Sequence, residues 1–438
     1  MKKPKQSGLL YAYYADDFTG STDVLEALAL HGVPAVLFTR PPDRSDLEKF
    51  PGCRAVGIAG ESRGRTPAWM EHHLPEIFAA MRRLGAPVNQ YKVCSTFDSS
   101  PRVGSIGKAM ELGMRAFATA WVPVVVGAPH LGRWVVFANL FAAAHGEIYR
   151  GEVHRIDRHP TMQRHPVTPM LESDLRLHLA RQTRMRIGLV DLASFQAGII
   201  RERLAHQLDT GAGAVVFDGI DQAMLEETAA LLWRGAQRRQ IFAVGSSGLA
   251  YGLLGSWRRA ASELPKEQSQ RNKSASVDRL LVLSGSCSPA TAKQIRRARQ
   301  DGFAAIRLRG AAPWEAETRS ALRALARGKS VVLFTALGPE DMNKRREGTL
   351  GPPLGLLLRR LLLASGVRRV LIAGGDTSTD AVKKLGLSAL TFAAPLTPGA
   401  PLCRGHASGS QLDGLELVLK GGQIGQEDFF LRVREGRA

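Results

Sequence analysis

Two adjacent carboxylates, Asp16 and Asp17, stand between an apolar run at 9–14 and a segment at 24–30 that has the pattern of a helix. The apolar run has the composition of a buried strand. Ligands of an open parallel sheet bind where its strands end, so a carboxylate here could orient or deprotonate a substrate hydroxyl. One aspartate could simply cap the helix, but capping does not account for two carboxylates followed by a glycine turn. We therefore predict that the pair is catalytic, and the sequence leaves open which of the two is the base.

A second polar cluster follows the strand expected at 88–93. Hydroxyl groups and Asp98 crowd the end of this strand between Lys92 and Arg102. The segment 104–107 then opens a helix, whose first backbone amides would attract an anion such as a carboxylate. The alternative is a serine-rich turn that satisfies Asp98 locally.

Ser62 and Arg63 follow the strand expected at 55–59. Arg63 offers a cationic partner for a carboxylate. Residues 60–64 also match the letters of a GxSxG nucleophile elbow, but no histidine partner for Ser62 can be named. We therefore expect a ligand-binding pair rather than a hydrolase.

The middle of the chain, 154–174, is dense in His, Asp and Glu. The spacings match no metal-ligand template, and the prolines indicate a rigid loop. We interpret it as a loop that faces the substrate or bridges the domains.

The C-terminal part repeats one device three times: a short apolar strand followed by a glycine-rich loop, at 284–288, 374–378 and 420–425. Glycine lets a backbone approach a phosphate closely, and small hydroxyls add donors. No GxxxxGK[ST] motif is present, so a phosphate site must be built in another way than in a P-loop NTPase. Three such loops, one of them with Lys420, suggest a nucleotide pocket in which Asp376 could hold Mg²⁺.

Helical segments lie between most of the strand-like runs of the chain. The runs are at 9–14, 35–38, 55–59, 88–93, 123–126, 186–190, 214–217, 241–244, 280–283, 304–308, 330–334, 369–372 and 415–419. Strands that alternate with helices indicate an α/β fold with mostly parallel sheets. The polar, aperiodic stretch 263–278 indicates a linker. We predict two α/β domains, 1–262 and 279–438.

The composition narrows the classes of partner. The 438 residues include 59 Lys+Arg and 40 Asp+Glu, a net charge of +19, which attracts anions. The positive charge is spread along the chain and only 6% of residues are aromatic, so we expect small anionic ligands and no nucleic acid. No apolar run is long enough to span a bilayer, and four scattered cysteines suit a reducing compartment, so we expect a cytoplasmic protein without membrane contact.

Taken together, the motifs resemble those of the four-carbon acid sugar kinase family over almost the whole chain. The resemblance rests on segments 15–20, 92–101, 284–288, 374–378 and 420–423. It implies an N-terminal domain that binds an acid sugar and a C-terminal domain that binds ATP. Members phosphorylate the terminal hydroxyl of threonate, erythronate or 3-oxo-tetronate. We expect the active site to lie in the cleft between the two domains.

The resemblance also implies which residues bind each ligand. The substrate residues would be Asp16, Asp17, Ser62, Arg63, Lys92 and Asp98, with Arg102 as a further cation for the carboxylate of the acid. The nucleotide residues would be Ser284, Ser286, Gly374, Gly375, Asp376, Thr377, Lys420, Gly421 and Gly422. Many members have Glu in place of Asp376 and Lys-Ser-Gly at 420–422, and the segment 124–168 also departs from the tetronate kinase pattern. These departures leave the identity of the acid open.

We therefore expect a kinase that uses ATP and Mg²⁺ to phosphorylate a small sugar acid. Asp17 or Asp16 would deprotonate the attacking hydroxyl, while glycine-loop amides, Lys420 and Mg²⁺ would neutralise the transferring phosphoryl group. The alternatives are a kinase for another polyhydroxy acid and a non-catalytic regulator that binds a sugar acid. A dehydrogenase would need a GxGxxG motif after its first strand, which this chain lacks. The sequence leaves a homodimer open.

Overall fold

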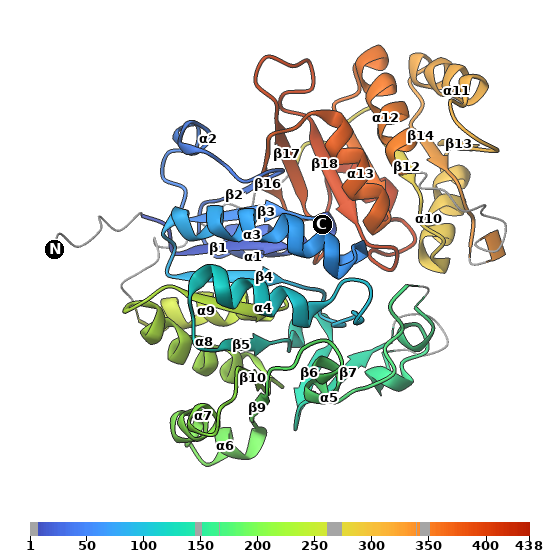
Figure 1. Ribbon diagram of the computed structural model, residues 1–438. Coiled ribbons are helices and arrows are strands. Elements are labelled where there is room, and N and C mark those ends of the chain that lie inside the picture. The colour runs from blue at the N-terminus through green and yellow to red at the C-terminus, as the bar shows by residue number, and fades with distance from the viewer. Residues whose placement is uncertain (1–7, 145–150, 166, 261–273, 339, 342–350) are drawn as a thin grey trace. The chain divides into compact units, whose positions relative to one another are not determined.

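The computed structural model describes residues 8–144, 151–165, 167–260, 274–338, 340–341 and 351–438 (Figure 1). The chain divides into two compact units. The first comprises 8–16, 27–35 and the described residues from 41 to 260, and the second comprises 17–26, 36–40 and the described residues from 274 onward. Two segments near the N-terminus therefore group with the C-terminal half of the chain. The predicted domain boundaries stay a prediction, and 263–273 of the predicted linker lies outside the described residues.

The first unit is built on a sheet of parallel strands in the order β3-β1-β4-β11-β5-β10-β9. Their bounds are β1 (Tyr11–Ala15), β3 (Ala55–Ala59), β4 (Val88–Lys92), β5 (Val122–Val125), β9 (Ile187–Val190), β10 (Ala214–Phe217) and β11 (Ile241–Gly245). Most of their residues are buried, as parallel strands are when helices cover both faces of a sheet. The register pairs Lys92 with both Ala15 and Gly245, so these three strands end at the same edge.

Helices connect the strands of the first unit. The longer ones are α3 (Pro67–Leu84), α4 (Ile106–Phe117), α8 (Gln222–Ala236) and α9 (Gly248–Arg259), with α3 beside α4 and α8 beside α9 (Figure 1). The shorter ones are α2 (Arg44–Glu48), α5 (Leu175–Ala180), α6 (Leu192–Gln196) and α7 (Ile200–Asp209), with 3-10 turns at Ser62–Gly64, Pro129–Leu131, Ile156–Arg158 and Met162–Arg164. Phe78 of α3 and Phe117 of α4 pack on Phe242 of β11 in the core.

A small antiparallel sheet also belongs to the first unit, in the order β6 (Arg133–Val136), β7 (Asn139–Ala143), β8 (Val153–Arg155). The β6–β7 turn places Phe137 at φ 48° and Ala138 at φ 64°, a left-handed conformation that costs energy for residues other than glycine. The buried carboxylate of Asp218 accepts hydrogen bonds from both of their N–H groups, at 2.6 and 2.9 Å. These charge-assisted bonds offset the strain of the turn.

The second unit has its own sheet, in the order β13-β14-β12-β15-β18-β17-β16-β2. The bounds are β2 (Ala35–Phe38), β12 (Leu281–Ser284), β13 (Ala304–Arg307), β14 (Val331–Phe334), β15 (Arg369–Ala373), β16 (Ala389–Ala394), β17 (Leu402–His406) and β18 (Glu416–Lys420). The strands from β13 to β18 are parallel, and β17, β16 and β2 continue the sheet in antiparallel pairs. The predicted α/β fold with mostly parallel sheets is confirmed.

Six helices or parts of helices accompany this sheet in the described residues. They are residues 18–26 of α1 (Phe18–Leu30), α10 (Pro289–Gln300), α11 (Glu315–Ala326), α12 (Gly351–Ser365), α13 (Gly375–Leu385) and α14 (Phe429–Glu435). Arg369, 1% exposed, pairs with Glu416 and donates to the Val433 and Ala275 carbonyls. One buried guanidinium thus holds α14 and the end of the predicted linker against the sheet.

Glu26 is a buried carboxylate of α1 whose Oε2 accepts a hydrogen bond from Gly399 N–H at 2.8 Å, within the second unit. Burial raises its pKa from 4.5 to about 8. The unfolded chain therefore loses this proton at lower pH than the folded one, and the free energy of unfolding should fall as pH rises from 4.5 to about 8.

Glu26→Gln keeps an acceptor for Gly399 without the charge, so we expect it to gain about 2 to 4 kcal/mol over the parent as pH rises through this window. Denaturant titrations of both proteins at the two ends of the window measure the difference. If the free energies of unfolding of the two proteins changed with pH in the same way, the raised pKa of Glu26 would be contradicted.

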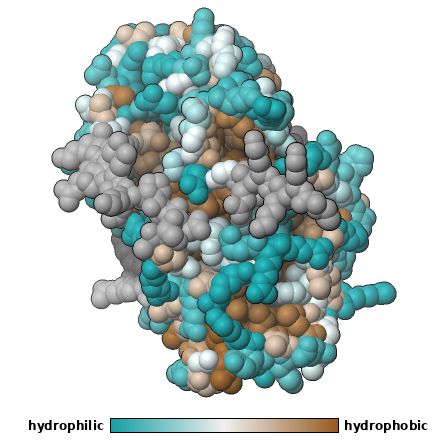
Figure 2. Space-filling model, turned by 90° about the vertical axis from the view of Figure 1, so that its left-hand side faces the viewer, coloured by the Kyte–Doolittle hydropathy of each residue, from teal (hydrophilic) through white to brown (hydrophobic). Residues whose placement is uncertain are grey.

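On the face shown in Figure 2, hydrophilic side chains are spread widely between smaller apolar areas and do not gather in one block. No helix in the described part of the chain is both long enough and apolar enough to cross a membrane.

Candidate active site

Asp16 is held by Arg63 in the first unit. The guanidinium donates through Nη2 to Oδ1 at 2.8 Å and through Nε to Oδ2 at 3.2 Å, the two-point geometry in which arginine binds carboxylates most strongly. The Asp16 side chain is nearly fully buried. Both carboxylate oxygens of Asp16 therefore bond to the same guanidinium.

Asp17 begins α1 and has a different environment. Its Oδ1 accepts from Gly20 N–H at 2.7 Å and its Oδ2 from the Thr19 hydroxyl at 2.8 Å. The bond from Gly20 is the helix-capping interaction that the sequence offered as the structural alternative. Amide and hydroxyl donors hold a carboxylate less strongly than a guanidinium fork does. Of the two predicted catalytic aspartates, Asp17 is the one that lies in the second unit.

The start of α13 lies next to Asp17. Gly374 has φ +116°, and a Cβ placed on the following residue, Gly375, would lie 3.6 Å from Asp17 Oδ2 and 3.8 Å from Thr19 Oγ1. Asp17, Thr19 and both glycines belong to the second unit. The expected base and one of the three expected phosphate loops are therefore neighbours.

The three glycine loops of the second unit come together. A Cβ on Gly285 would overlap the Thr377 hydroxyl, and a Cβ on Gly422 would lie 2.9 Å from Ser286 Oγ. A Cβ on Gly374 would lie 3.2 Å from Thr377 Oγ1. The absence of side chains at these glycines is therefore what lets the loops pack against one another.

The two candidate serines of the first loop differ in their surroundings. Ser286 Oγ accepts from Ser288 N–H at 3.2 Å and faces Gly422. Ser284 ends β12, is fully buried, and its hydroxyl has no hydrogen-bond partner among the described residues. Ser286 is the better placed of the two to meet a ligand at the glycine loops.

Lys420 ends β18 and its side chain is 0% exposed. Nζ donates to Thr291 Oγ1 at 2.9 Å and to the Gly422 carbonyl at 3.4 Å. The sequence predicted that this lysine helps to neutralise the transferring phosphoryl group, and in the structure its Nζ bonds to the protein beneath residues 421–422. Asp376 lies in α13, and its side chain is outside the described part of the structure.

Asp98 is buried in the first unit and accepts from Thr96 Oγ1 at 2.5 Å and Thr168 Oγ1 at 3.2 Å. Burial alone would raise the pKa of Asp98, but the Arg63 guanidinium and the Thr96 hydroxyl outweigh it and the pKa is lowered. The carboxylate is therefore anionic at neutral pH. His165 also lowers the pKa of Asp98 and lies within hydrogen-bond distance of Thr168, so the loop rich in His and Pro reaches this cluster.

The other predicted substrate residues differ in how deeply they are buried. Ser62 is fully buried and its hydroxyl lies 2.8 Å from that of Tyr91, which gives it a phenol rather than a histidine as partner and does not favour a hydrolase. Lys92 is buried at the end of β4, and its carbonyl accepts from Asp16 N–H at 2.9 Å. Arg102 is exposed.

Sequence reasoning missed Arg133 of β6. Its Nη1 donates to the carbonyls of Leu131, Gly132 and Ala143 at 2.8 to 3.2 Å. Burial lowers the pKa of Arg133, and the nearby Cys94 thiol acts in the opposite direction. Since Arg63 and Asp98 in turn act on Cys94, Arg133 is a further cation near the predicted substrate residues. An arginine within a short apolar strand is the signal that could have found it.

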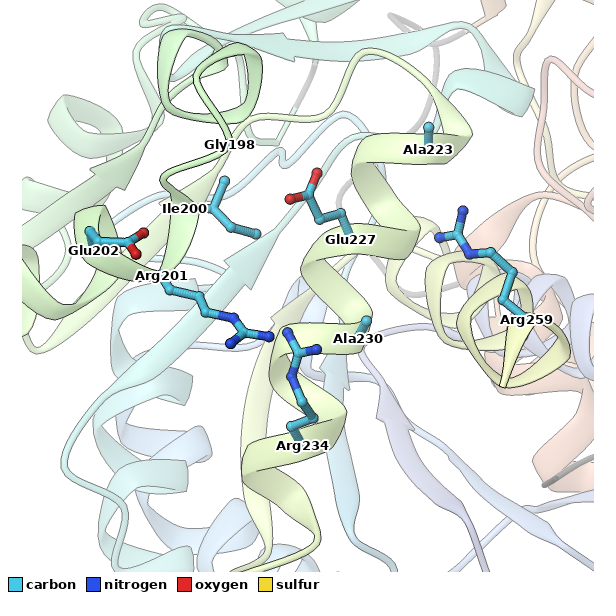
Figure 3. A pocket seen from close by; sticks show the side chains of 9 residues that line it. All are labelled: Gly198, Ile200, Arg201, Glu202, Ala223, Glu227, Ala230, Arg234 and Arg259. Atoms are coloured by element: carbon cyan, nitrogen blue, oxygen red, sulfur yellow. The ribbon is translucent and has the colours of Figure 1, made fainter. Parts of the chain in front are cut away.

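A shallow groove of about 660 Å³ lies elsewhere in the first unit, on α7, α8 and α9 (Figure 3). The guanidinium groups of Arg201 and Arg234 point toward one another across it, with Glu227 nearby. It contains none of the predicted site residues.

Comparisons with known proteins match both units. Residues 11–253 match the sugar-binding N-terminal domain, and residues 281–430 match the nucleotide-binding C-terminal domain. A 3-oxo-isoapionate kinase from Paraburkholderia graminis is 46% identical over 98% of this chain and 95% of its own length. The chain belongs to the four-carbon acid sugar kinase family.

Further relatives agree with this membership. A 3-oxo-tetronate kinase from Cupriavidus necator is 31% identical over 95% of this chain and 94% of its own. Two solved structures share the fold: a protein described as a putative tRNA synthase from Salmonella typhimurium (TM-score 0.77, 24% identity, covering 98% and 99% of the two chains) and a Haemophilus influenzae protein of family DUF1537 (TM-score 0.69, 21% identity, covering 97% and 99%). As a member of this family the protein is a small sugar-acid kinase, a phosphotransferase that acts on a hydroxyl group.

Proposed function

We propose that this sugar-acid kinase transfers the γ-phosphoryl group of ATP to a terminal hydroxyl of a 3-oxo sugar acid, with 3-oxo-isoapionate as the first candidate. The observation that carries the proposal is the position of Asp17 beside Gly375 at the start of α13. The choice of acid is supported by the 46% identity to a 3-oxo-isoapionate kinase, compared with 28 to 31% for the 3-oxo-tetronate kinases.

In this mechanism Asp17 takes the proton of the attacking hydroxyl as the new O–P bond forms and the bond from the γ-phosphorus to the bridging oxygen breaks, which releases ADP. The N–H groups at the start of α13 and in the loops that follow Gly285 and Gly422 would donate to phosphate oxygens, since glycines without side chains let a phosphate approach the backbone. Donors fixed before the reaction stabilise the charge that develops on the phosphoryl group.

The carboxylate of the acid needs cations, and the first unit holds several. Arg63 is engaged with Asp16, which favours a positioning role for that pair. Lys92, Arg102 and Arg133 are the candidates for binding the carboxylate of the acid. Asp98, an anion at neutral pH, would accept hydrogen bonds from substrate hydroxyls.

Mg²⁺ would be held chiefly by phosphate oxygens, with Asp376 as the expected carboxylate. The described residues hold no group of three or more His, Cys, Asp or Glu side chains placed to bind a metal ion. Mg²⁺ commonly uses one or two carboxylates plus phosphate and water. The proposed location of the enzyme is the cytoplasm, where ATP is available. Its proposed assembly is a homodimer of this chain.

A coupled assay that detects ADP tests the function with full-length protein, ATP and a panel of 3-oxo sugar acids, threonate and erythronate. We expect turnover with 3-oxo-isoapionate to exceed that with 3-oxo-tetronate in kcat/KM. Higher kcat/KM for 3-oxo-tetronate would overturn the choice of acid. Nucleotide binding without turnover of any acid would favour the non-catalytic regulator.

A further inference from the structure

The ammonium group of Lys420 is enclosed by a small ring of hydrogen bonds. Nζ donates to Thr291 Oγ1 and to the Gly422 carbonyl, and the Thr291 hydroxyl donates to the same carbonyl at 2.9 Å. The Lys420 carbonyl also accepts from Gly374 N–H at 3.0 Å. One residue therefore joins two of the three glycine loops.

This ring fixes the direction of a peptide group. A trans peptide is planar, so its N–H points opposite to its C=O. Because the Gly422 carbonyl is held by both Thr291 and Lys420, the N–H of Gln423 must point away from Lys420. Gly422 itself faces Ser286 and Ser288, where a Cβ would come within 2.9 Å of Ser286 Oγ and Ser288 Cβ.

Lys420 has no compensating charge among the described residues. Burial lowers its pKa to about 7, and no ionisable side chain acts on it. Some charged groups on the neighbouring elements have other partners: Lys293 of α10 pairs with Glu427, and Arg369 of β15 pairs with Glu416. Asp380 of α13 faces Gly351. The remaining ones are exposed, namely Arg404 of β17 and Lys383 and Lys384 of α13. The side chain of Asp376, also on α13, is outside the described part of the structure. A buried ammonium without a counter-ion is costly, so an anion bound close by would favour its charged form.

We infer that Lys420 is a positioning residue: with Thr291 it orients the 422–423 peptide toward the nucleotide phosphates without touching them, and phosphate binding draws a proton onto Nζ. The inference rests on the proposed nucleotide site. It differs from direct neutralisation of the phosphoryl group, because the effect passes through Gly422.

Calorimetric titration of the full-length protein with ADP, in two buffers of different ionisation enthalpy, measures the proton taken up on binding. About one pH unit above the lysine's pKa we expect net uptake of most of a proton by the parent and none by Lys420→Met. Lys420→Met should also raise the dissociation constant of ADP about 10- to 100-fold and leave the KM for the sugar acid unchanged.

Matched variants separate positioning from direct contact. Thr291→Val removes the hydroxyl at nearly constant volume and, like Lys420→Met, should weaken ADP binding. Thr291→Ser keeps the hydroxyl and should bind ADP as tightly as the parent does. Lys329→Met, at an exposed lysine of the same unit, should also bind like the parent. Since the parent and the threonine variants suffice, the test survives if Lys420→Met does not fold.

Unchanged ADP affinity in Thr291→Val, or no proton uptake by the parent, would overturn the inference. Binding of ADP without turnover of any acid would contradict the proposed function and leave the role of Lys420 standing. A parent protein that binds no adenine nucleotide would overturn both.

Discussion

Asp17→Asn is expected to lower kcat by about a thousandfold, the range typical of a lost general base. The amide keeps an oxygen that can accept from Gly20 N–H, so α1 should stay capped and the fold intact. It cannot take the proton of the attacking hydroxyl. Steady-state kinetics should show the loss in kcat, and calorimetry should show ADP binding close to that of the parent.

Asp16→Asn is the matched control, because the two residues are adjacent and the chemical change is the same. It removes the charge that holds Arg63 in its two-point ion pair. We expect a higher KM for the sugar acid and a lower melting temperature, with a smaller loss of kcat than in Asp17→Asn. If Asp16→Asn loses more kcat than Asp17→Asn while its KM stays normal, the base is Asp16.

The parallel core of both units could be predicted from the sequence because each parallel strand is a short apolar run between helical segments. The missed strands β6, β7, β8, β16 and β17 all form antiparallel pairs. In β17, for example, the sequence Leu-Cys-Arg-Gly-His contains an exposed Arg404 and a glycine, so its composition does not mark a buried strand. Such strands are specified by their partners rather than by local hydrophobicity.

Candidate residues could be predicted where a motif places them at the end of a strand, as with Asp17 and Gly375. Their proximity depends on residues 17–26 grouping with the C-terminal half of the chain, and a single sequence gives no signal for that. Thr168 and Asp98 form a hydrogen bond although they are 70 residues apart in the sequence. The residues around each of them do not predict this contact. The direction of Lys420 was equally hidden, since spacing along a strand does not say whether an ammonium at its end turns inward or outward.

Gly285→Ala is expected to weaken ADP binding about 100-fold, the equivalent of roughly 3 kcal/mol of overpacking. Gly285 follows β12, and its N–H donates to the Ala373 carbonyl at 3.0 Å. The added methyl group would overlap the Thr377 hydroxyl, so either the first loop or the start of α13 must move. Calorimetric titration with ADP measures the loss, and thermal unfolding checks that the second unit remains folded.

Gly235→Ala is a suitable control, because a Cβ at this position of α8 meets nothing within 4 Å and alanine favours a helix. It should leave ADP binding unchanged. The specific cause of the loss is tested with Thr377→Ala, which removes the overlapped hydroxyl. If the clash is the cause, adding Gly285→Ala to Thr377→Ala should cost much less affinity than adding it to the parent. Strict additivity of the two changes would mean that the methyl group acts on the nucleotide itself, and that the loops do not depend on one another as their packing indicates.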